Sequence, residues 1–510
     1  MRIARLLHSL FLCAPLFSAD AKPNILVILT DDHRYDAMGF LDHPFLKTPN
    51  LDRLAAEGAY FKNAYVTTSL CSPSRASILT GLYAHNHRVV DNYNPVSESL
   101  TFFPQVLQKE GYQTAFIGKW HMGDSDKKQR GFDHWISFKG QGVYVPDPNL
   151  LKAKGRFVPQ ATNSGFNING KKVPQKGYIT DELTGFAEDW LAEKSDEKPF
   201  LLYVSHKGVH ADFLPPNQHA FKYDDVEIPT PPTPLANPEL FTDPPMWVRN
   251  QSNSRHGTEF AYYTGVDMKK YYRRYCEALL AVDDSVGRLL TKLEKSGELE
   301  NTIVLYLGDN GFIFGEHGLI DKRCAYEESV RIPMLMRYPK AIKGGTVVGK
   351  IVANIDVAPT LLNASGATPL ADIDGESFWP LATGETLPDW RDYLLYEYYW
   401  ERNYPQTPTT HAVIGERYKY IRYHGVWDTD ELYDTKADPH ERQNLFNDPK
   451  HQERIAEMNK ALFSLLEDSK GNNMPLLPDR GTKYLHRKTD GTKGALFPEH
   501  FYRKTGTAGK

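Results

Sequence analysis

The pattern of apolar and polar positions predicts alternating strands and helices over most of the chain. Continuous apolar runs are typical of strands buried on both faces of a parallel-type sheet, and they occur at 24–30, 112–118, 200–205 and 302–307. Apolar residues at helical spacing, with start signals such as Thr48-Pro49, predict helices at 49–58, 73–81, 103–110, 179–195 and 272–293. This alternation predicts an α/β fold with a large, mostly parallel mixed sheet flanked by helices.

The alternation of predicted strands and helices gives way to short strands near residue 385, and we expect the sheet-and-helix domain to cover 22–385. Short strands expected at 393–399, 411–414 and 418–423 predict a smaller antiparallel sheet in a C-terminal α+β subdomain, 386–478. The last segment, 479–510, holds eight Lys or Arg against three Asp or Glu, so we expect an extended basic tail. Seven prolines between 228 and 246 predict a long irregular excursion over the surface.

The first 21 residues are typical of a signal peptide. Arg2 and Arg5 precede an apolar run at 6–17, and Ala19-Asp20-Ala21 supplies a small-x-small cleavage pattern. That run is too short to span a bilayer, and no later segment is long and apolar enough to do so. We therefore expect an exported protein, periplasmic or secreted, without a membrane span.

Charge and cysteine content exclude some classes of partner and of structural framework. A net charge of −4 on 510 residues argues against a nucleic-acid partner, which would require a basic surface. The 29 tyrosines suit a surface that stacks on sugar rings, although large proteins rich in loops also carry many. Without the signal peptide three cysteines remain, which do not form a disulfide framework. Cys276 and Cys324 could pair, whereas Cys71 needs another explanation.

Acidic and amide side chains follow two of the predicted buried strands. Asp31-Asp32 comes after the first strand, and Asp309-Asn310 comes after the strand at 302–307. In open α/β sheets the carboxyl ends of the strands are where active sites form. Hard oxygen ligands of this kind favour Ca²⁺ or Mg²⁺ over Zn²⁺. For a single Asp-Asp pair, a turn or a helix cap is the alternative.

A set of basic side chains accompanies these acids. Lys119 and His121 are expected to share one face of an extended segment. The predicted helix start at Ser72-Pro73, just after Cys71, would add free backbone N–H groups and a favourable dipole. Together they could cradle a tetrahedral oxyanion, although each histidine alone could be an ordinary core or surface residue. The full set is Arg75, Lys119, His121, His206, His210 and Lys322.

The run C-S-P-S-R at 71–75, followed by A-S-I-L-T-G at 76–81, resembles the signature of the type I (formylglycine-dependent) sulfatases. That signature is C-x-P-x-R, a short spacer and T-G. Supporting segments are N-I-L-V-I-L-T-D-D from Asn24, G-K-W-H from Gly118, G-D-N-G from Gly308, G-E-H-G-L-I-D-K from Gly315 and E-L-Y-D-T-K-A-D-P-H-E-R-Q-N-L from Glu431. The resemblance is to the bacterial arylsulfatase and N-acetylglucosamine-6-sulfatase branch, and it implies an alkaline-phosphatase-like fold.

The resemblance implies that a maturation enzyme oxidises Cys71 to formylglycine, an aldehyde. One hydroxyl of its hydrate, a gem-diol, would attack the sulfur of a sulfate ester and release the alcohol. The second hydroxyl would then lose its proton, so that the aldehyde re-forms and sulfate leaves. This is covalent nucleophilic catalysis in two steps.

Roles carry over by position from the family. Arg75 would hold the gem-diol, Lys119 and Lys322 would bind sulfate oxygens, and His121 would assist the elimination step. His210 is expected to protonate the leaving alcohol, with His206 as its competitor; Asp212 stands where many members have proline. The Ca²⁺ ligands implied by the family are Asp31, Asp32, Asp309, Asn310 and the modified Cys71.

The sequence favours a sulfated carbohydrate as the substrate. His85, His87 and Gln141 are candidates for contacts to the sugar, or they order the loop around the helix. Long loops at 143–177 and 213–257 are expected to shape the pocket. Two other functions stay open: a phosphonate monoester or phosphodiester hydrolase of the same superfamily, and a glycan-binding protein without catalysis.

Overall fold

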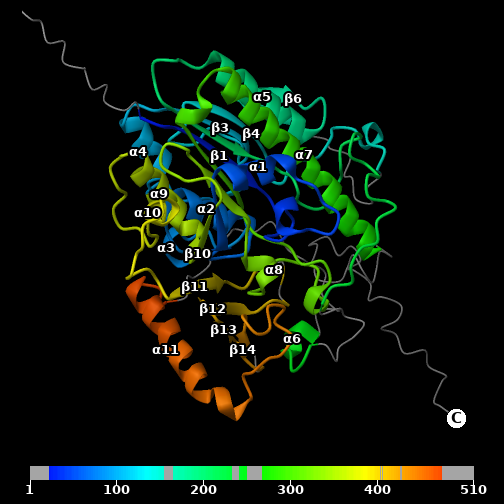
Figure 1. Ribbon diagram of the computed structural model, residues 1–510, viewed down its shortest axis with the longest axis vertical. Helices are drawn as coiled ribbons and strands as arrows, with labels where there is room; N and C mark the ends of the chain where they lie inside the picture. The colour runs from blue at the N-terminus through cyan, green and yellow to red at the C-terminus, as the bar shows by residue number, and fades with distance from the viewer. Residues whose placement is uncertain are drawn as a thin grey trace, which may run out of the picture.

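A sheet of ten strands forms the centre of the larger part of this computed structural model (Figure 1). The structure describes residues 22–153, 165–232, 241–249, 267–401, 404, 406–425 and 428–473, so the predicted signal peptide and basic tail lie outside it. The strands, in chain order, are β1 (Asn24–Thr30), β2 (Ala59–Tyr65), β3 (Gln113–Lys119), β4 (His134–Phe138), β5 (Gly165–Ile168), β6 (Lys171–Pro174), β7 (Phe200–Ser205), β8 (Thr302–Gly308), β9 (Met334–Arg337) and β10 (Thr346–Ala353).

The middle of this sheet is parallel and its two sides are mixed. The spatial order is β10-β2-β9-β8-β1-β7-β3-β4-β5-β6. From β8 to β4 each strand is parallel to its neighbour, whereas β9, β5 and β6 pair antiparallel. The predicted mixed, mostly parallel sheet is confirmed, and its parallel block contains all four strands that the apolar runs predicted.

Helices cover both faces of the sheet, which explains why β1 is apolar at every position from Ile25 to Leu29. Leu26 and Ile28 join one hydrophobic core, while Ile25, Val27 and Leu29 join a second core on the opposite face. The first core is closed by α1 (Pro49–Glu57), α5 (Ile179–Glu193) and α7 (Met268–Lys295). The second is closed by α2 (Cys71–Thr80), α4 (Phe103–Lys109), α9 (Val357–Ala364) and α10 (Trp379–Ala382).

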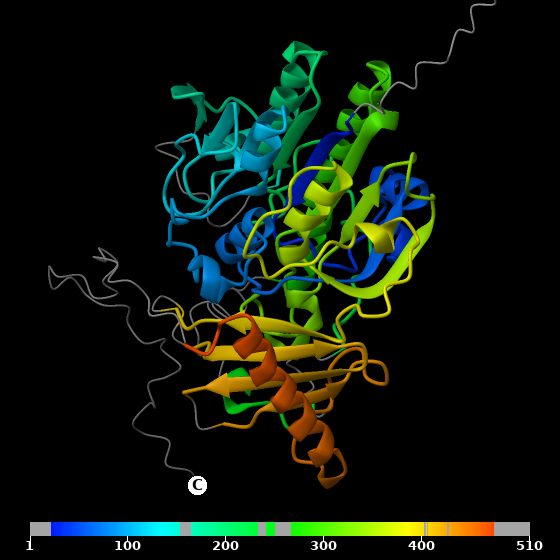
Figure 2. The same cartoon turned by 90° about the vertical axis from the view of Figure 1, so that its left-hand side faces the viewer.

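A second sheet of four antiparallel strands lies below the first in Figure 1, with one long helix across its outer face (Figure 2). Its strands are β11 (Tyr393–Tyr398), β12 (Thr409–Gly415), β13 (Tyr418–His424) and β14 (Glu431–Asp434), and the helix is α11 (Gln452–Asp468). The predicted antiparallel sheet is confirmed, and β14 was not predicted. The boundary placed at 385/386 stays a prediction.

The remaining helices are short. They are α3 (Ala84–His87), α6 (Met246–Arg249) and α8 (Glu327–Val330), together with 3-10 turns at Gly39–Leu41, Pro148–Leu150, Leu299–Asn301, Glu316–Gly318, Asn354–Asp356 and Pro449–His451. Within the described ranges, no helix combines the length and the apolar character needed to cross a bilayer.

Candidate active site

Four adjacent parallel strands, β8, β1, β7 and β3, end at one edge of the sheet and carry the candidate residues there. The register aligns Thr30 with Gly308 and Leu29 with Ser205. The backbone pairing continues past the strand ends, because Asp309 N donates to Thr30 O and Val209 N donates to Asp31 O. Segments far apart in the sequence therefore meet at the carboxyl edge, as expected for an active site on an open α/β sheet.

Gly118 allows β3 to approach β7 closely at this edge. Its φ of 127° lies in the region that favours glycine, and a Cβ there would lie 1.9 Å from Ser205 O. The next residue, Lys119, is the last of β3 and is buried. The expected extended segment from Lys119 to His121 is wrong, because His121 has a left-handed φ of 59°. Both side chains nevertheless reach the site, as their contacts below show.

Cys71 is the first residue of α2, so the helix expected to begin at Pro73, after Ser72, begins two residues earlier. Leu70 is the N-cap residue and has an extended backbone. Its side chain has no polar group and makes no capping hydrogen bond. Instead, the side chain of Asn92 accepts a hydrogen bond of 3.1 Å from Ser72 N, and Ser72 Oγ donates to the carbonyl of His121. These contacts fix the first turn of α2, and with it Cys71, against the loop after β3.

The carboxylates of Asp31, Asp32 and Asp309 form the acidic centre of the site. One oxygen of each lies within 4.8 Å of the others, and all three side chains are buried. Among the described residues, Asp32 Oδ2 and Asn310 Oδ1 have no hydrogen-bond partner. Buried oxygens without partners are costly unless something outside the chain satisfies them, so this set fits a hard divalent cation such as Ca²⁺.

Three cations surround the acidic centre. Arg75 donates to Asp309 Oδ2 at 2.9 Å and to the Lys119 carbonyl at 2.7 Å. Lys119 Nζ forms an ion pair with Asp31 and donates a hydrogen bond to Gln141 Oε1. Lys322 Nζ forms an ion pair with Asp32. Lys322 also reaches Cys71 Sγ at 2.8 Å. The predicted cluster of acids and cations is thus assembled around the thiol.

The charges of this cluster shift its carboxyl groups in opposite directions. Burial alone would raise the pKa of Asp31, but Lys119, His210, Lys322 and Arg75 hold it well below its ordinary value. Burial raises the pKa of Asp32 to about 7 despite Lys322, with further contributions from Asp31 and Asp309. Two adjacent aspartates of one loop are therefore electrostatically different.

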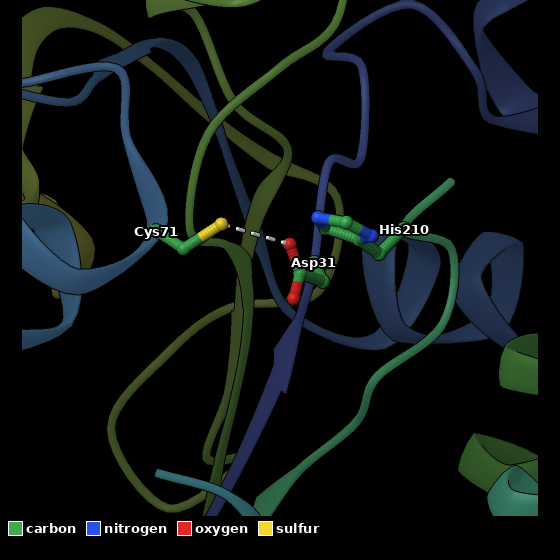
Figure 3. Close-up of side chains that lie close together, drawn as sticks. All are labelled: Asp31, Cys71 and His210. Atoms are coloured by element: carbon green, nitrogen blue, oxygen red, sulfur yellow. Dashed lines mark hydrogen bonds between the residues drawn. The ribbon is translucent and has the colours of Figure 1, made fainter. Parts of the chain in front are cut away.

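The thiol of Cys71 is not an ordinary nucleophile in this setting. It donates to Asp31 Oδ1 at 3.4 Å, and burial together with the charge of Asp31 raises its pKa to about 12 (Figure 3). A thiolate is the reactive form of cysteine, so an unmodified Cys71 is chemically inert at neutral pH. Cys276 and Cys324 are buried free thiols, and they do not pair.

The structure distinguishes between the two histidines that compete for one role. The ring of His210 lies beside Asp31 in Figure 3, with ligand atoms of His210, Asp31 and Cys71 mutually within 4.8 Å. Burial, and then Lys119, hold its pKa well below the ordinary value. His206 instead bonds Ser285 of α7 at 3.0 Å, and it is not part of that group. The geometry favours His210 as the histidine at the reacting centre.

His121 also lies at the site. Its Nδ1 is 3.4 Å from Ser72 Oγ, and burial followed by Lys119 holds its pKa well below its ordinary value.

The contacts of His85 and His87 favour a structural role over a sugar contact. His85 Nδ1 lies 2.8 Å from Glu397 of β11, and Nε2 lies 2.9 Å from the Ser469 carbonyl. His87 Nε2 contacts Ser77 Oγ at 3.1 Å, while its Nδ1 accepts from Val89 N. Both nitrogens of each ring are occupied by the protein. Gln141, by contrast, contacts Lys119 directly.

Lys207 is a buried residue beside the site that the sequence interpretation overlooked. It follows β7 by two residues, between His206 and His210, and only 3% of its surface is exposed. The available signal was a lysine two residues after a buried strand, next to residues already assigned to the site.

Comparison with known proteins places this site in a family. The sulfatase family model matches residues 23–367, and that of the N-sulphoglucosamine sulphohydrolase C-terminal region matches residues 315–468. An N-acetylglucosamine-6-O-sulfatase of Bacteroides thetaiotaomicron is 34% identical, over 90% of this chain and 88% of its own length.

Two solved structures are similar over most of the chain. One, a complex with its substrate D-glucosamine-2-N,6-O-disulfate, has a TM-score of 0.79 and 31% identity, covering 89% of this chain and 99% of its own. A phosphonate monoester hydrolase of Agrobacterium radiobacter has a TM-score of 0.71 at 21% identity, covering 88% and 96%, and shows the alkaline-phosphatase-like fold alone. With the C-S-P-S-R run at the centre of the site, the chain belongs to the sulfatase family and is a sulfuric ester hydrolase.

Proposed function

We propose that this chain is an exported sulfatase that removes sulfate from a sulfated amino sugar, with a 6-O-sulfated glucosamine as the first candidate. The observation that carries the proposal is the likeness, over nearly the whole chain, to an N-acetylglucosamine-6-O-sulfatase and to a structure holding a disulfated glucosamine. Export is supported by the apolar run and the Ala19-Asp20-Ala21 pattern at the start of the sequence.

In this proposal the chain's cations bind and orient the sulfate ester. Lys119 and Lys322 approach the acidic centre from different strands and loops, and both point their Nζ atoms at it. Such donors, already in place, stabilise the negative charge that develops on the sulfate and on the leaving oxygen. Arg75, held by Asp309, Ser205 and the Lys119 carbonyl, keeps the first turn of α2 in position.

Two groups complete the site. Asp31, Asp32, Asp309 and Asn310 would hold Ca²⁺, which when bound supplies positive charge that polarises the sulfate. A maturation enzyme would convert Cys71 to formylglycine, which supplies the nucleophile that the inert thiol cannot. The setting of Cys71 supports this part, because burial and the charge of Asp31 raise the pKa of its thiol and favour the protonated form.

His210 is the proposed proton donor to the leaving alcohol. Its low pKa makes its imidazolium a strong acid, and a sulfate bound against it adds negative charge that favours the protonated ring. Its backbone carbonyl accepts a hydrogen bond of 2.6 Å from Tyr144 OH, which fixes the loop that carries it. His121, in the segment after the neighbouring strand β3, is the candidate for the elimination step.

The test is a substrate panel with protein produced alongside a maturation enzyme. Sulfate release is measured from N-acetylglucosamine-6-sulfate, glucosamine-2-N,6-O-disulfate and an aryl sulfate, and phosphate release from a phosphomonoester and a phosphodiester. We expect turnover of a sulfated glucosamine to exceed that of either phosphate ester, and Cys71→Ala to abolish it. A preference for the phosphodiester would favour the phosphonate or phosphodiester hydrolase alternative. Glycan binding without turnover by fully modified protein would favour a glycan-binding protein.

A further inference from the structure

Lys207 differs from every other buried lysine in the described part of the chain. Four lysines are buried there: Lys119, Lys207, Lys322 and Lys419. Lys119, Lys322 and Lys419 each pair with at least one carboxylate. No carboxylate, carbonyl or hydroxyl group of the described residues accepts a hydrogen bond from Lys207 Nζ. Its one described partner is the ring of Tyr144, whose centroid lies 4.6 Å away.

An unpaired ammonium group in the interior lowers the stability of a protein. Water is lost from the charge, and the face of an aromatic ring replaces only part of that solvation. Burial, and then the like charge of Lys119, lower the pKa of Lys207 to about 8. The group still carries its charge at neutral pH in most molecules, and no carboxylate of the described residues forms an ion pair with it.

The position of Lys207 explains which anion could satisfy it. Lys207 belongs to the loop after β7 that also carries His210, and Tyr144 contacts both residues, through its ring and its hydroxyl. The charges of Lys119, Asp31, Asp212 and Asp32 act on Lys207, so Lys207 lies in the neighbourhood of the acidic centre and of Lys119. An anion held between Lys119 and Lys207 would relieve the repulsion between them.

We propose that Lys207 Nζ donates a hydrogen bond to a sulfate oxygen of the bound substrate. This inference rests on the proposed function, since it assumes a sulfated ligand at the acidic centre. Two sources offer the same chemistry: the sulfate that is hydrolysed, and a second sulfate on the same sugar. Lys207 is then a substrate-binding residue in addition to Lys119 and Lys322.

The variants Lys207→Met and Lys207→Arg test this assignment, with Lys222→Met as a control on an exposed lysine of the following segment. For Lys207→Met we expect KM for glucosamine-2-N,6-O-disulfate to rise by about tenfold or more, as for the loss of one charge-assisted hydrogen bond. Lys207→Arg should recover part of that loss, and Lys222→Met should match the wild type. The melting temperature of Lys207→Met should be equal or higher, because a buried unpaired charge is removed.

Comparing the 6-O-monosulfate with the 2-N,6-O-disulfate of glucosamine shows whether Lys207 contacts the sulfate that is hydrolysed or a second sulfate on the same sugar. An equal rise in KM for the 6-O-monosulfate and for the disulfate assigns Lys207 to the sulfate that is hydrolysed. A rise confined to the disulfate assigns it to the second sulfate. Unchanged KM for both sugars overturns the proposal, and so does a lower melting temperature with no recovery in Lys207→Arg, which would indicate a structural lysine.

The proposed function is judged separately, by turnover of the wild type. Calorimetric titration of inorganic sulfate into the Cys71→Ala protein and into the Cys71→Ala, Lys207→Met protein needs no turnover. We expect weaker sulfate binding in the double variant, and equal binding would contradict a contact to the hydrolysed sulfate. A wild type without sulfatase activity but with Lys207-dependent sulfate binding would refute the proposed function and leave the anion site standing.

Discussion

Asp32 has one carboxylate oxygen, Oδ2, that no donor in the described part of the chain reaches, and its other oxygen is held by Lys322 and Asn310. Its pKa, raised to about 7, reflects burial and the charges of Asp31 and Asp309. A divalent cation would coordinate the free oxygen of Asp32. It would also offset the repulsion between the carboxylates of Asp31, Asp32 and Asp309. Asp32 is therefore the residue at which metal binding is most directly tested.

We predict that Ca²⁺ raises the melting temperature of the protein and that a chelator lowers it. A ligand at 100 times its Kd stabilises the folded state by about 2.7 kcal/mol. Asp32→Ala should remove the effect of Ca²⁺ on the melting temperature, whereas Asp225→Ala, on the surface, should keep it. Differential scanning calorimetry with and without Ca²⁺ measures the shift. An equal shift in wild type and Asp32→Ala would show that the cation binds elsewhere.

The residues of the acidic centre could be predicted because each follows a recognisable buried strand. Asp31 and Asp309 stand directly after apolar runs, and parallel pairing then brings them together without further information. His85 could not be interpreted in this way, because its partners, Glu397 and the Ser469 carbonyl, lie more than 300 residues away. Lys207 was overlooked because its isolation from counter-ions is a property of three-dimensional packing.

At the scale of the element, the edge formed by β3 and β7 depends on one glycine. Gly118→Ala would place a Cβ 1.9 Å from Ser205 O in a backbone conformation that side chains rarely adopt. We predict that it destabilises the protein by more than about 2 kcal/mol and removes most activity, because Lys119 is displaced. Thermal unfolding and sulfate release measure the two effects.

The matched control for this prediction is Gly185→Ala. Gly185 lies inside α5, and a Cβ there meets no atom within 4 Å. Alanine is favoured over glycine in a helix, so this variant should be stabilised by about 0.5–1 kcal/mol with unchanged activity. If both substitutions had the same small effect, the close approach of β3 and β7 would not be what holds Lys119 in place.

The elements that could be predicted are those with a strong local pattern. The four strands predicted from apolar runs, β1, β3, β7 and β8, are buried at nearly every position, and α7 shows a long apolar stripe. β2, by contrast, is interrupted by the exposed Lys62 and the half-buried Asn63, and its partners β9 and β10 follow about 280 residues later. The start of α2 was misplaced because its capping contact comes from Asn92, outside the local sequence.

At the scale of the whole molecule, neutral histidines are buried in both parts of the fold. Burial lowers the pKa of His206 and of His87 to about 3, and that of His411 in the four-stranded sheet to about 4. The unfolded chain binds protons to these residues below pH 6.5, while the folded chain resists protonation until the lowered pKa is reached. Their contribution to stability is therefore full above pH 6.5 and is lost as the pH falls toward 3.

We predict that His206→Gln weakens the loss of stability between pH 7 and pH 5. At 1.36 kcal/mol per pKa unit, His206 accounts for up to about 2 kcal/mol of that loss. Denaturant unfolding of wild type, His206→Gln and the exposed control His440→Gln at the two pH values measures the difference. A wild type and a His206→Gln variant with parallel pH dependence would contradict a neutral buried His206.

The two-sheet architecture also determines which features of the molecule could be predicted from the sequence. The small sheet packs with α11 into a third hydrophobic core, joined to the large part by contacts such as His85 with Glu397. The antiparallel strands were expected from the change in the sequence after about residue 385, but how they pack against the large sheet depends on contacts between residues far apart in the chain, such as His85 and Glu397. The loops at 143–177 and 213–257, which we expect to shape the pocket, lie partly outside the described ranges.

Mass spectrometry of the peptide that contains Cys71, taken from catalytically active protein, tests the proposed conversion of Cys71 to formylglycine. We expect an aldehyde or its hydrate at position 71, in a fraction that rises with the specific sulfatase activity of each preparation. An active preparation in which every Cys71 is an unmodified thiol would contradict it, because the buried thiol, with its pKa near 12, could not be the nucleophile.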